Sequence, residues 1–186
     1  EHRATPARPA LPVVGKMGGA RGVTVSSRLD DPDGRFLGVM TAVVDPAYFL
    51  GPQGLQELGP DGAVLGVYRK THPFCTEAVS GGGWVTPGDT VTVCDTELGR
   101  IGMIICFDGD FPELARIEAL LGAEVICRPS ALLRSADIWE LTSRARAYDN
   151  HVFIVGANAV GQDPAGVLYF GNSHIVTPIG HIIAKA

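Results

Sequence analysis

The chain has 186 residues, 46% of them hydrophobic, and a formal net charge of −5 at pH 7, so it is long enough for one compact domain with a substantial core. The negative charge and the lack of any cluster of Lys and Arg argue against a nucleic-acid partner. No apolar run reaches about 18 residues, which argues against a membrane-spanning helix.

The first third of the chain predicts strands separated by turns. The segment Glu1–Val14 has neither an initiator Met nor an apolar signal core, and we interpret it as a lead-in or as the middle of a longer protein. Two strands are expected at Gly22–Ser26 and Phe36–Asp45. After a Gly/Pro-rich stretch at 51–62, Ala63–Tyr68 predicts a further strand.

Strands and helices alternate from residue 91 onward. Val91–Asp95 and Arg100–Phe107 predict a hairpin. Asp110 and Glu113 resemble a capping box that opens a helix. We expect this helix to end at Gly122 and to bury one apolar stripe, consisting of Leu114, Ile117 and Leu121.

The remaining elements complete a mixed sheet. Glu124–Cys127 and Val152–Ala157 predict buried strands, and Ser135–Asn150 predicts a second helix between them. The apolar face expected for this helix is Ile138, Leu141, Ala145 and Tyr148. A final hairpin is expected from Ile175–Thr177 and His181–Ala184. Because two helices cover only one face of a sheet, we expect a second sheet on the other face and therefore an α/β sandwich.

Cys106 is the strongest candidate for a functional residue. It lies at the carboxyl end of an apolar strand, where the chain turns through Gly109 into a helix. Open α/β sheets place functional groups at this point, and the pattern resembles a nucleophile elbow. The amides of a nearby helix N-terminus can stabilise a thiolate and a developing oxyanion. The alternative is that Cys106 is only a small buried apolar residue.

Lys70 is the second candidate. A lone Lys after a strand is usually a solvated surface charge, but Pro73, Phe74 and Glu77 follow this one closely. Such a segment can hold a cation and a carboxylate side by side in a pocket. A fixed Lys is well suited to stabilise the oxyanion formed during acyl transfer.

Several segments together resemble the carbon–nitrogen hydrolase, or nitrilase, superfamily. They are YRKTHPF at 68–74, PGD at 87–89, LGRIGMIICFDGDFPELAR at 98–116, RPSA at 128–131, RARAYDNHVFIVGAN at 144–158 and YFGNSHIVTPIG at 169–180. The resemblance implies one domain over residues 1–186, although residues 1–60 match the family poorly. It also implies an αββα sandwich, apparently incomplete at its N-terminus, that pairs through its helices into homo-oligomers.

The same resemblance implies roles for individual residues. Cys106 takes the position of the nucleophile, Lys70 that of the oxyanion-stabilising lysine, and Glu77 that of a second structural or catalytic glutamate. The backbone N–H of Phe107 would complete the oxyanion hole. The residues that would line the acyl pocket are Phe74 and Ser130.

One family feature has no counterpart in the sequence. The catalytic triad of the family includes a general-base Glu in a Pro-Glu motif well before the lysine, whereas the only Pro-Glu here is Pro112-Glu113. The glutamates before Lys70 are Glu1 and Glu57, and neither has the expected context. We therefore expect a fragment, a lobe that is not represented, or a catalytically impaired chain.

The preferred interpretation is a cofactor-free and metal-free cysteine hydrolase that converts a small aliphatic amide to an acid and ammonia through a thioester. A nitrilase or an N-carbamoyl hydrolase is an alternative within the family. Two alternatives outside this mechanism are a non-catalytic scaffold or interaction module and a Cys–His hydrolase that uses His151 or His174. The four cysteines form no Cys-x-x-Cys pair, so we expect reduced thiols in a cytoplasmic protein whose partner is a small amide or nitrile.

Overall fold

The computed structural model describes residues 64–186, except for 84, 134 and 163–165, and the backbone of five strands before residue 64. The chain divides into two compact units, Glu1–Phe49 and Leu50–Ala186. The first unit contains β1 (Lys16–Met17) paired with β2 (Ala20–Arg21), and β3 (Val23–Asp30) paired with β4 (Phe36–Val44), all antiparallel. The strands predicted near 22–26 and 36–45 are thus confirmed, and the turn between them lies outside the described residues.

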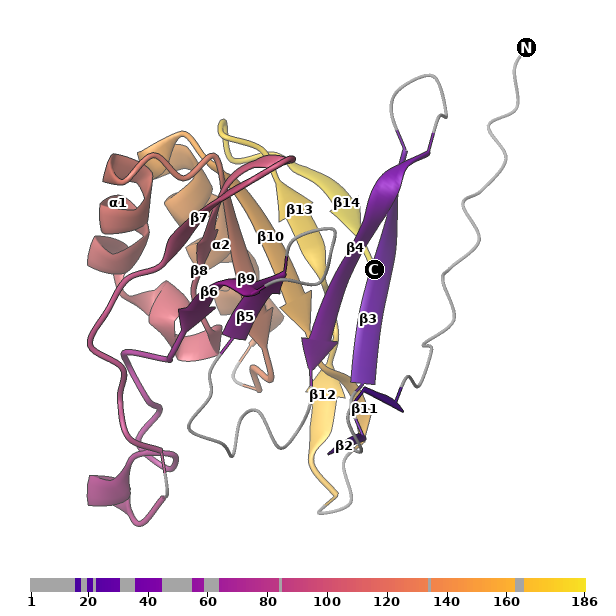
Figure 1. The fold of residues 1–186 in the computed structure, drawn as a ribbon. Coiled ribbons are helices and arrows are strands. Elements are labelled where there is room, and N and C mark those ends of the chain that lie inside the picture. Colours follow the sequence, from indigo (N-terminus) through magenta and orange to yellow (C-terminus); the bar gives the residue numbers. More distant parts are fainter. Residues whose placement is uncertain are drawn as a thin grey trace. The chain divides into compact units, whose positions relative to one another are not determined.

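A six-stranded mixed sheet forms the centre of the second unit (Figure 1). Its order is β14-β13-β10-β9-β8-β7, with β8, β9 and β10 parallel and the outer strands antiparallel. The strands are β7 (Val93–Thr96), β8 (Gly99–Met103), β9 (Val125–Ser130), β10 (Phe153–Asn158), β13 (His174–Val176) and β14 (Ile182–Lys185).

Apolar β-branched side chains of the central strands form the core on this sheet. Ile126, Ile154 and Val176 are adjacent on β9, β10 and β13 and are completely buried. Their burial fixes the register, since a shift by one residue would expose all three side chains.

Two helices lie on one side of the sheet (Figure 1), as predicted. They are α1 (Pro112–Leu120) and α2 (Ala136–Asn150). Ser135 caps α2 by accepting a hydrogen bond from the Asp137 N–H. The capping box predicted for α1 is wrong: the N-cap is Phe111, which makes no side-chain cap, and Pro112 starts the helix because a first-turn N–H needs no helical partner.

The predicted buried face of α1 is confirmed only for Leu114, and that of α2 is wrong. In α1 the buried residues are Leu114, Ala115 and Glu118, whereas the expected Ile117 and Leu121 are exposed. In α2 the buried residues are Trp139, Ser143 and Ala147. They recur every four residues, so they form one face against the sheet, and the large Leu141 and Tyr148 point away from it.

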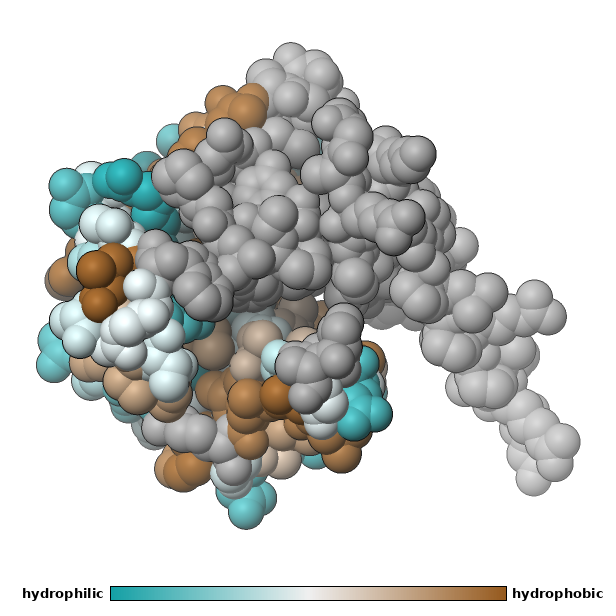
Figure 2. Space-filling model, turned by 90° about the horizontal axis from the view of Figure 1, so that it is seen from below, coloured by the Kyte–Doolittle hydropathy of each residue, from teal (hydrophilic) through white to brown (hydrophobic). Residues whose placement is uncertain are grey.

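Exposed apolar side chains therefore remain on both helices. Leu120 of α1 is 79% exposed and Leu141 of α2 is 61% exposed. Seen from below, hydrophobic residues are also grouped together on part of the surface rather than scattered singly (Figure 2). Grouped exposed apolar residues are typical of interaction surfaces.

The second unit also contains two small hairpins. β5 (Leu55–Leu58) pairs with β6 (Val64–Tyr68), and β11 (Val160–Gln162) pairs with β12 (Leu168–Phe170). β6 confirms the strand predicted before Lys70 and lies against the β7 region, where the Thr92 hydroxyl donates to the Val67 carbonyl over 2.9 Å. Among the described residues, no helix is long and apolar enough to cross a bilayer.

Candidate active site

Cys106 begins a tight turn beyond the carboxyl end of β8. The strand ends at Met103 rather than at Phe107 as predicted, and Cys106–Asp110 forms a 3₁₀ turn, η2. Cys106 has φ 49°, a left-handed conformation that is uncommon for a residue with a side chain. Such strained backbone persists only where the surrounding structure enforces it, and it is concentrated at functional sites.

Buried Arg128 of β9 stabilises this conformation by hydrogen bonds to the backbone of the turn. Its Nε and Nη2 donate to the Cys106 carbonyl at 3.0 and 2.9 Å, its Nη1 donates to Thr142 at 2.7 Å, and its guanidinium lies 4.6 Å from the Trp139 ring centroid. Burial lowers the pKa of Arg128 to about 10, although the charges of Cys106 and Asp110 oppose this shift. The side chain therefore stays cationic at neutral pH and can hold the turn continuously.

A second arginine holds the other end of the turn. Arg146 of α2 donates from Nε to the Gly109 carbonyl and from Nη2 to the Asp110 carbonyl, both at 3.1 Å. A side chain at Gly109 would collide with the Arg128 guanidinium. The glycine therefore permits the close approach of the arginine to the turn.

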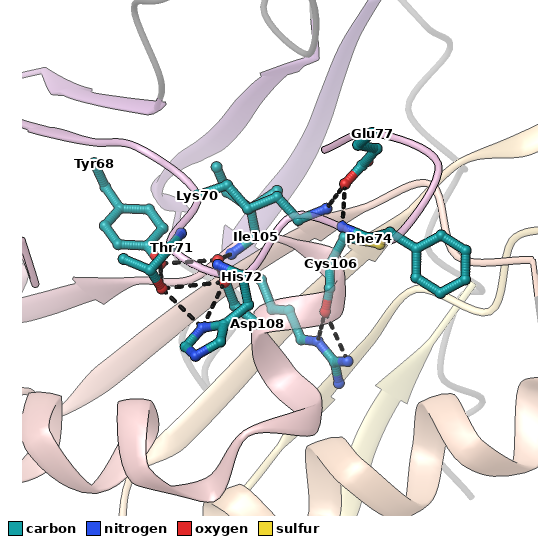
Figure 3. A network of polar contacts seen from close by, with 10 residues as sticks. Tyr68, Lys70, Thr71, His72, Phe74, Glu77, Ile105, Cys106 and Asp108 are labelled. Carbon is teal, nitrogen blue, oxygen red and sulfur yellow. Dashed lines mark hydrogen bonds and ion pairs between the residues drawn. The ribbon is translucent and has the colours of Figure 1, made fainter. Parts of the chain in front are cut away.

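Lys70 and Glu77 form an ion pair beside Cys106 (Figure 3). Lys70 Nζ lies 2.5 Å from Glu77 Oε2, and the same oxygen accepts the Phe74 N–H at 2.7 Å. The Lys70 side chain is only 7% exposed, so it is not a solvated surface charge. In Figure 3 the side chain of Cys106 points toward this pair. The structure thus brings the three predicted catalytic residues together, while their roles stay predictions.

Glycines hold the backbone on both sides of the pair. The Gly88 N–H donates to the Lys70 carbonyl at 2.8 Å, and a side chain at Gly88 would collide with the backbone of Arg69. A side chain at Gly83 would collide with the Glu77 carbonyl. The PGD segment at 87–89 and the glycine-rich loop after Glu77 are therefore parts of the frame that holds Lys70 and Glu77.

The predicted pocket residues fall into two groups. Phe74 and Phe107 pack edge to face with ring centroids 5.1 Å apart, and Phe107 packs in the same way on Phe111 at 5.2 Å. Ser130 ends β9 and pairs in register with Asn158, and it is 1% exposed. The two aromatic residues form an apolar wall next to Cys106, and the part of Ser130 in the pocket stays a prediction.

Asp108 is the residue that sequence reasoning missed. Its carboxylate is completely buried. Oδ2 accepts from the Tyr68 hydroxyl at 2.8 Å and from the Ile105 N–H at 2.9 Å, whereas Oδ1 accepts from the His72 N–H at 2.9 Å (Figure 3). The Thr71 hydroxyl and His72 Nδ1 both lie 3.3 Å from Oδ1. A carboxylate two residues after a candidate nucleophile, just beyond the end of a buried strand, was the available signal.

The histidines of the alternative mechanism occupy structural positions. His151 is the exposed C-cap of α2, in a left-handed conformation. His174 is buried against Trp139, and burial lowers its pKa. In the described part of the chain neither ring makes a hydrogen bond to Cys106. Glu1 and the side chain of Glu57, the two glutamates before Lys70, lie outside the described residues.

Glu118 is a second buried carboxyl beneath β8. Its Oε1 accepts the Met103 N–H at 3.1 Å, and its Oε2 has no hydrogen-bond partner among the described residues. Burial raises the pKa of Glu118 from 4.5 to about 8, the Asp108 charge adds to the shift, and the Met103 hydrogen bond opposes it. Glu118 is therefore protonated in the folded chain at neutral pH.

Glu118→Gln is expected to stabilise the chain increasingly as the pH rises from 5 to 8. In this window the folded state keeps a proton that the unfolded state has lost, so wild-type stability falls by about 1.4 kcal/mol per pH unit from this group. Glutamine resembles the protonated acid and does not titrate. Urea unfolding at several pH values measures the difference. The matched control is Glu113→Gln, an exposed position of the same helix, and a pH-independent effect of Glu118→Gln would contradict the expectation.

Comparisons with known proteins place this geometry in context. The family model described as carbon-nitrogen hydrolase matches residues 53–186. Omega-amidase NIT2 of Homo sapiens is 37% identical over 135 residues, which is 69% of this chain and 49% of that protein. The chain thus spans about half the length of the curated relatives it matches.

Solved structures show the same fold. The carbon-nitrogen hydrolase from Helicobacter pylori G27 has a TM-score of 0.62 and 28% identity, covering 89% of this chain and 57% of that chain. Saccharomyces cerevisiae Nit3, a member of branch 10 of the nitrilase superfamily, has a TM-score of 0.60 and 27% identity, covering 89% and 54% respectively. The α/β fold predicted from the sequence is therefore the fold of these proteins.

Proposed function

Because the chain belongs to the carbon–nitrogen hydrolase family, we propose that it carries the nucleophile of an enzyme that hydrolyses small aliphatic amides to carboxylic acids and ammonia. The observation that carries this proposal is the placement of Cys106, in a strained turn at the end of a parallel strand, beside the part-buried Lys70–Glu77 pair. The names of relatives, omega-amidase and amidase, support an amide as the substrate.

The proposed reaction has two stages. In the first, the sulfur of Cys106 attacks the amide carbonyl carbon, and Lys70 together with the Phe107 N–H stabilises the negative oxygen. The C–N bond then breaks, ammonia leaves with a proton from a general acid, and a thioester remains. In the second stage, water attacks the thioester, the C–S bond breaks, and the acid is released with regeneration of the thiol.

The pocket also bears on the choice of substrate. Phe74 and Phe107 provide an apolar wall, which suits an uncharged acyl group. The ammonium group of Lys70 is paired with the carboxylate of Glu77, so this cation faces a carboxylate rather than solvent. The segment Cys106–Glu113 also favours an amide over a nitrile or an N-carbamoyl compound, by its resemblance to the amidase branch.

The proposal is tested by incubating the 186-residue chain with acetamide and measuring ammonia and intact mass. We expect this chain to be inactive, or to form an acyl adduct on Cys106 without repeated turnover, because proton delivery to the leaving ammonia and activation of the water both need a positioned acid/base. No glutamate before Lys70 stands in a Pro-Glu segment. A longer form with such a segment is expected to release ammonia catalytically. If neither the 186-residue chain nor the longer form gives an adduct or ammonia, the alternative of a non-catalytic scaffold is favoured.

Assembly and location are part of the same proposal. The large exposed side chains of α1 and α2, such as Leu120 and Leu141, support a homo-oligomer paired through its helices, and sedimentation analysis would reveal a monomer if this is wrong. All four cysteines are unbridged, which supports a reducing compartment such as the cytoplasm; a disulfide found in the protein isolated from its native source would argue against this.

A further inference from the structure

Two segments distant in sequence meet at the carboxylate of Asp108. One segment, Tyr68–His72, carries Lys70, and the other is the turn that carries Cys106. Oδ1 binds the first segment through the His72 N–H and the Thr71 hydroxyl, and Oδ2 binds the Ile105 N–H, immediately before Cys106. The side chain is thus a bridge between the two segments.

Asp108 binds residues that precede and follow Lys70 in the sequence. The Tyr68 hydroxyl donates to Oδ2 at 2.8 Å and accepts the Thr71 N–H at 3.3 Å. Burial raises the pKa of Tyr68 well above its ordinary value, and the charge of Asp108 adds to this, so the phenol stays a donor at every physiological pH. Lys70 is therefore flanked by residues that the same carboxylate holds.

We propose that Asp108 is a positioning residue that sets the distance between Lys70 and Cys106 and thereby stabilises the thiolate and the oxyanion. The inference rests on the proposed function, because it assumes that Lys70 acts on Cys106. Asp108 itself touches neither the substrate nor the reacting atoms.

Asparagine at this position cannot replace the bridge. An amide offers one acceptor oxygen and one donor group, whereas both oxygens of Asp108 accept from donors that include the backbone N–H groups of Ile105 and His72. In either orientation of the amide, its NH₂ group would face an N–H donor. Asp108→Asn therefore releases one of the two segments while it keeps the size of the side chain.

The direction in which Asp108→Asn shifts the pH dependence of Cys106 reactivity distinguishes positioning of Lys70 from a direct effect of the Asp108 charge. A nearby lysine favours the thiolate, and a nearby carboxylate disfavours it. If Asp108 acted only through its charge, Asp108→Asn would make the thiol react at lower pH. If Asp108 positions Lys70, the same change moves the cation away, and the thiol reacts only at higher pH.

The experiment measures the rate at which iodoacetamide alkylates Cys106 as a function of pH, by mass spectrometry of the Cys106 peptide. It is made in a Cys75→Ala background, because Cys75 is an exposed free thiol that would compete for the reagent. We expect Lys70→Ala to move the midpoint of the curve to higher pH by about one unit, which lowers the rate at pH 7 about tenfold. Asp108→Asn is expected to move the midpoint in the same direction.

Two further variants make the result specific. Glu118→Gln alters another completely buried carboxyl that accepts a backbone N–H of β8 but does not bind the Lys70 segment, and it is expected to leave the curve unchanged. The double variant Tyr68→Phe/Thr71→Val removes two donors and keeps the Asp108 charge, so an upward shift there supports positioning even if Asp108→Asn does not fold.

The outcomes distinguish the inference from the function it rests on. An unchanged or lower midpoint for Asp108→Asn in a folded protein, with the expected shift for Lys70→Ala, overturns the inference alone. If Asp108→Asn does not fold, an unchanged midpoint in the double variant overturns it. No shift for Lys70→Ala overturns the pairing of Lys70 with Cys106 and the inference with it.

Discussion

Replacing Cys106 with alanine is expected to reduce amide hydrolysis by about 10⁴-fold or more in any form of the protein that turns over, since loss of a catalytic nucleophile has effects of this size. No covalent intermediate can form without the sulfur. Alanine keeps the Cβ atom, so the strain of the left-handed φ of 49° is unchanged and the fold should persist. The Arg128 bonds also persist, because they go to the backbone carbonyl of Cys106.

The measurement is ammonia release under saturating amide, with thermal unfolding to verify the fold. Cys127→Ala is a suitable control, because Cys127 is a half-buried thiol within β9. Its effect on turnover should stay within about twofold, as is usual for residues away from the reacting atoms. Residual activity of Cys106→Ala near the wild-type rate would remove Cys106 from the mechanism.

Lys70→Ala is expected to lower kcat by about 10²-fold or more, as loss of an oxyanion donor does. The Lys70 side chain is 7% exposed and its ammonium is paired with Glu77, so its charge acts in a partly water-excluded site where it is poorly screened. KM should change much less, because the negative oxygen develops only in the transition state. Steady-state kinetics of the turning-over form measure both constants.

Lys185→Ala provides a matched control for Lys70→Ala. Lys185 Nζ also lies 2.5 Å from a glutamate, Oε1 of Glu140, but its side chain is 53% exposed. Exposed ion pairs contribute little to stability, and no catalytic role is proposed for this pair. A kcat for Lys70→Ala close to that of Lys185→Ala would show that Lys70 is only a structural partner of Glu77.

Local patterns were sufficient to predict much of the second unit. Apolar β-branched runs predicted β8, β9 and β10, because a strand buried on both faces needs little beyond apolar content to be recognised. The position of Cys106 after such a run predicted its place at the sheet edge. Lys70 and Glu77 are only seven residues apart, so their proximity was also within reach of the sequence.

The sequence by itself thus determined the element types, the strand end that bears Cys106 and the short segment that bears Lys70 and Glu77, because these depend on neighbouring residues. The tertiary structure alone decided which helix face is buried, since the apolar residues of α1 and α2 occur on more than one face and packing selects among them. It also decided the contacts of Asp108 with Tyr68 and His72 and the contact of Arg128 with Cys106, which join residues 22 to 40 positions apart in the chain. Contacts over such separations depend on how strands and helices pack together, and local sequence periodicity does not predict that packing.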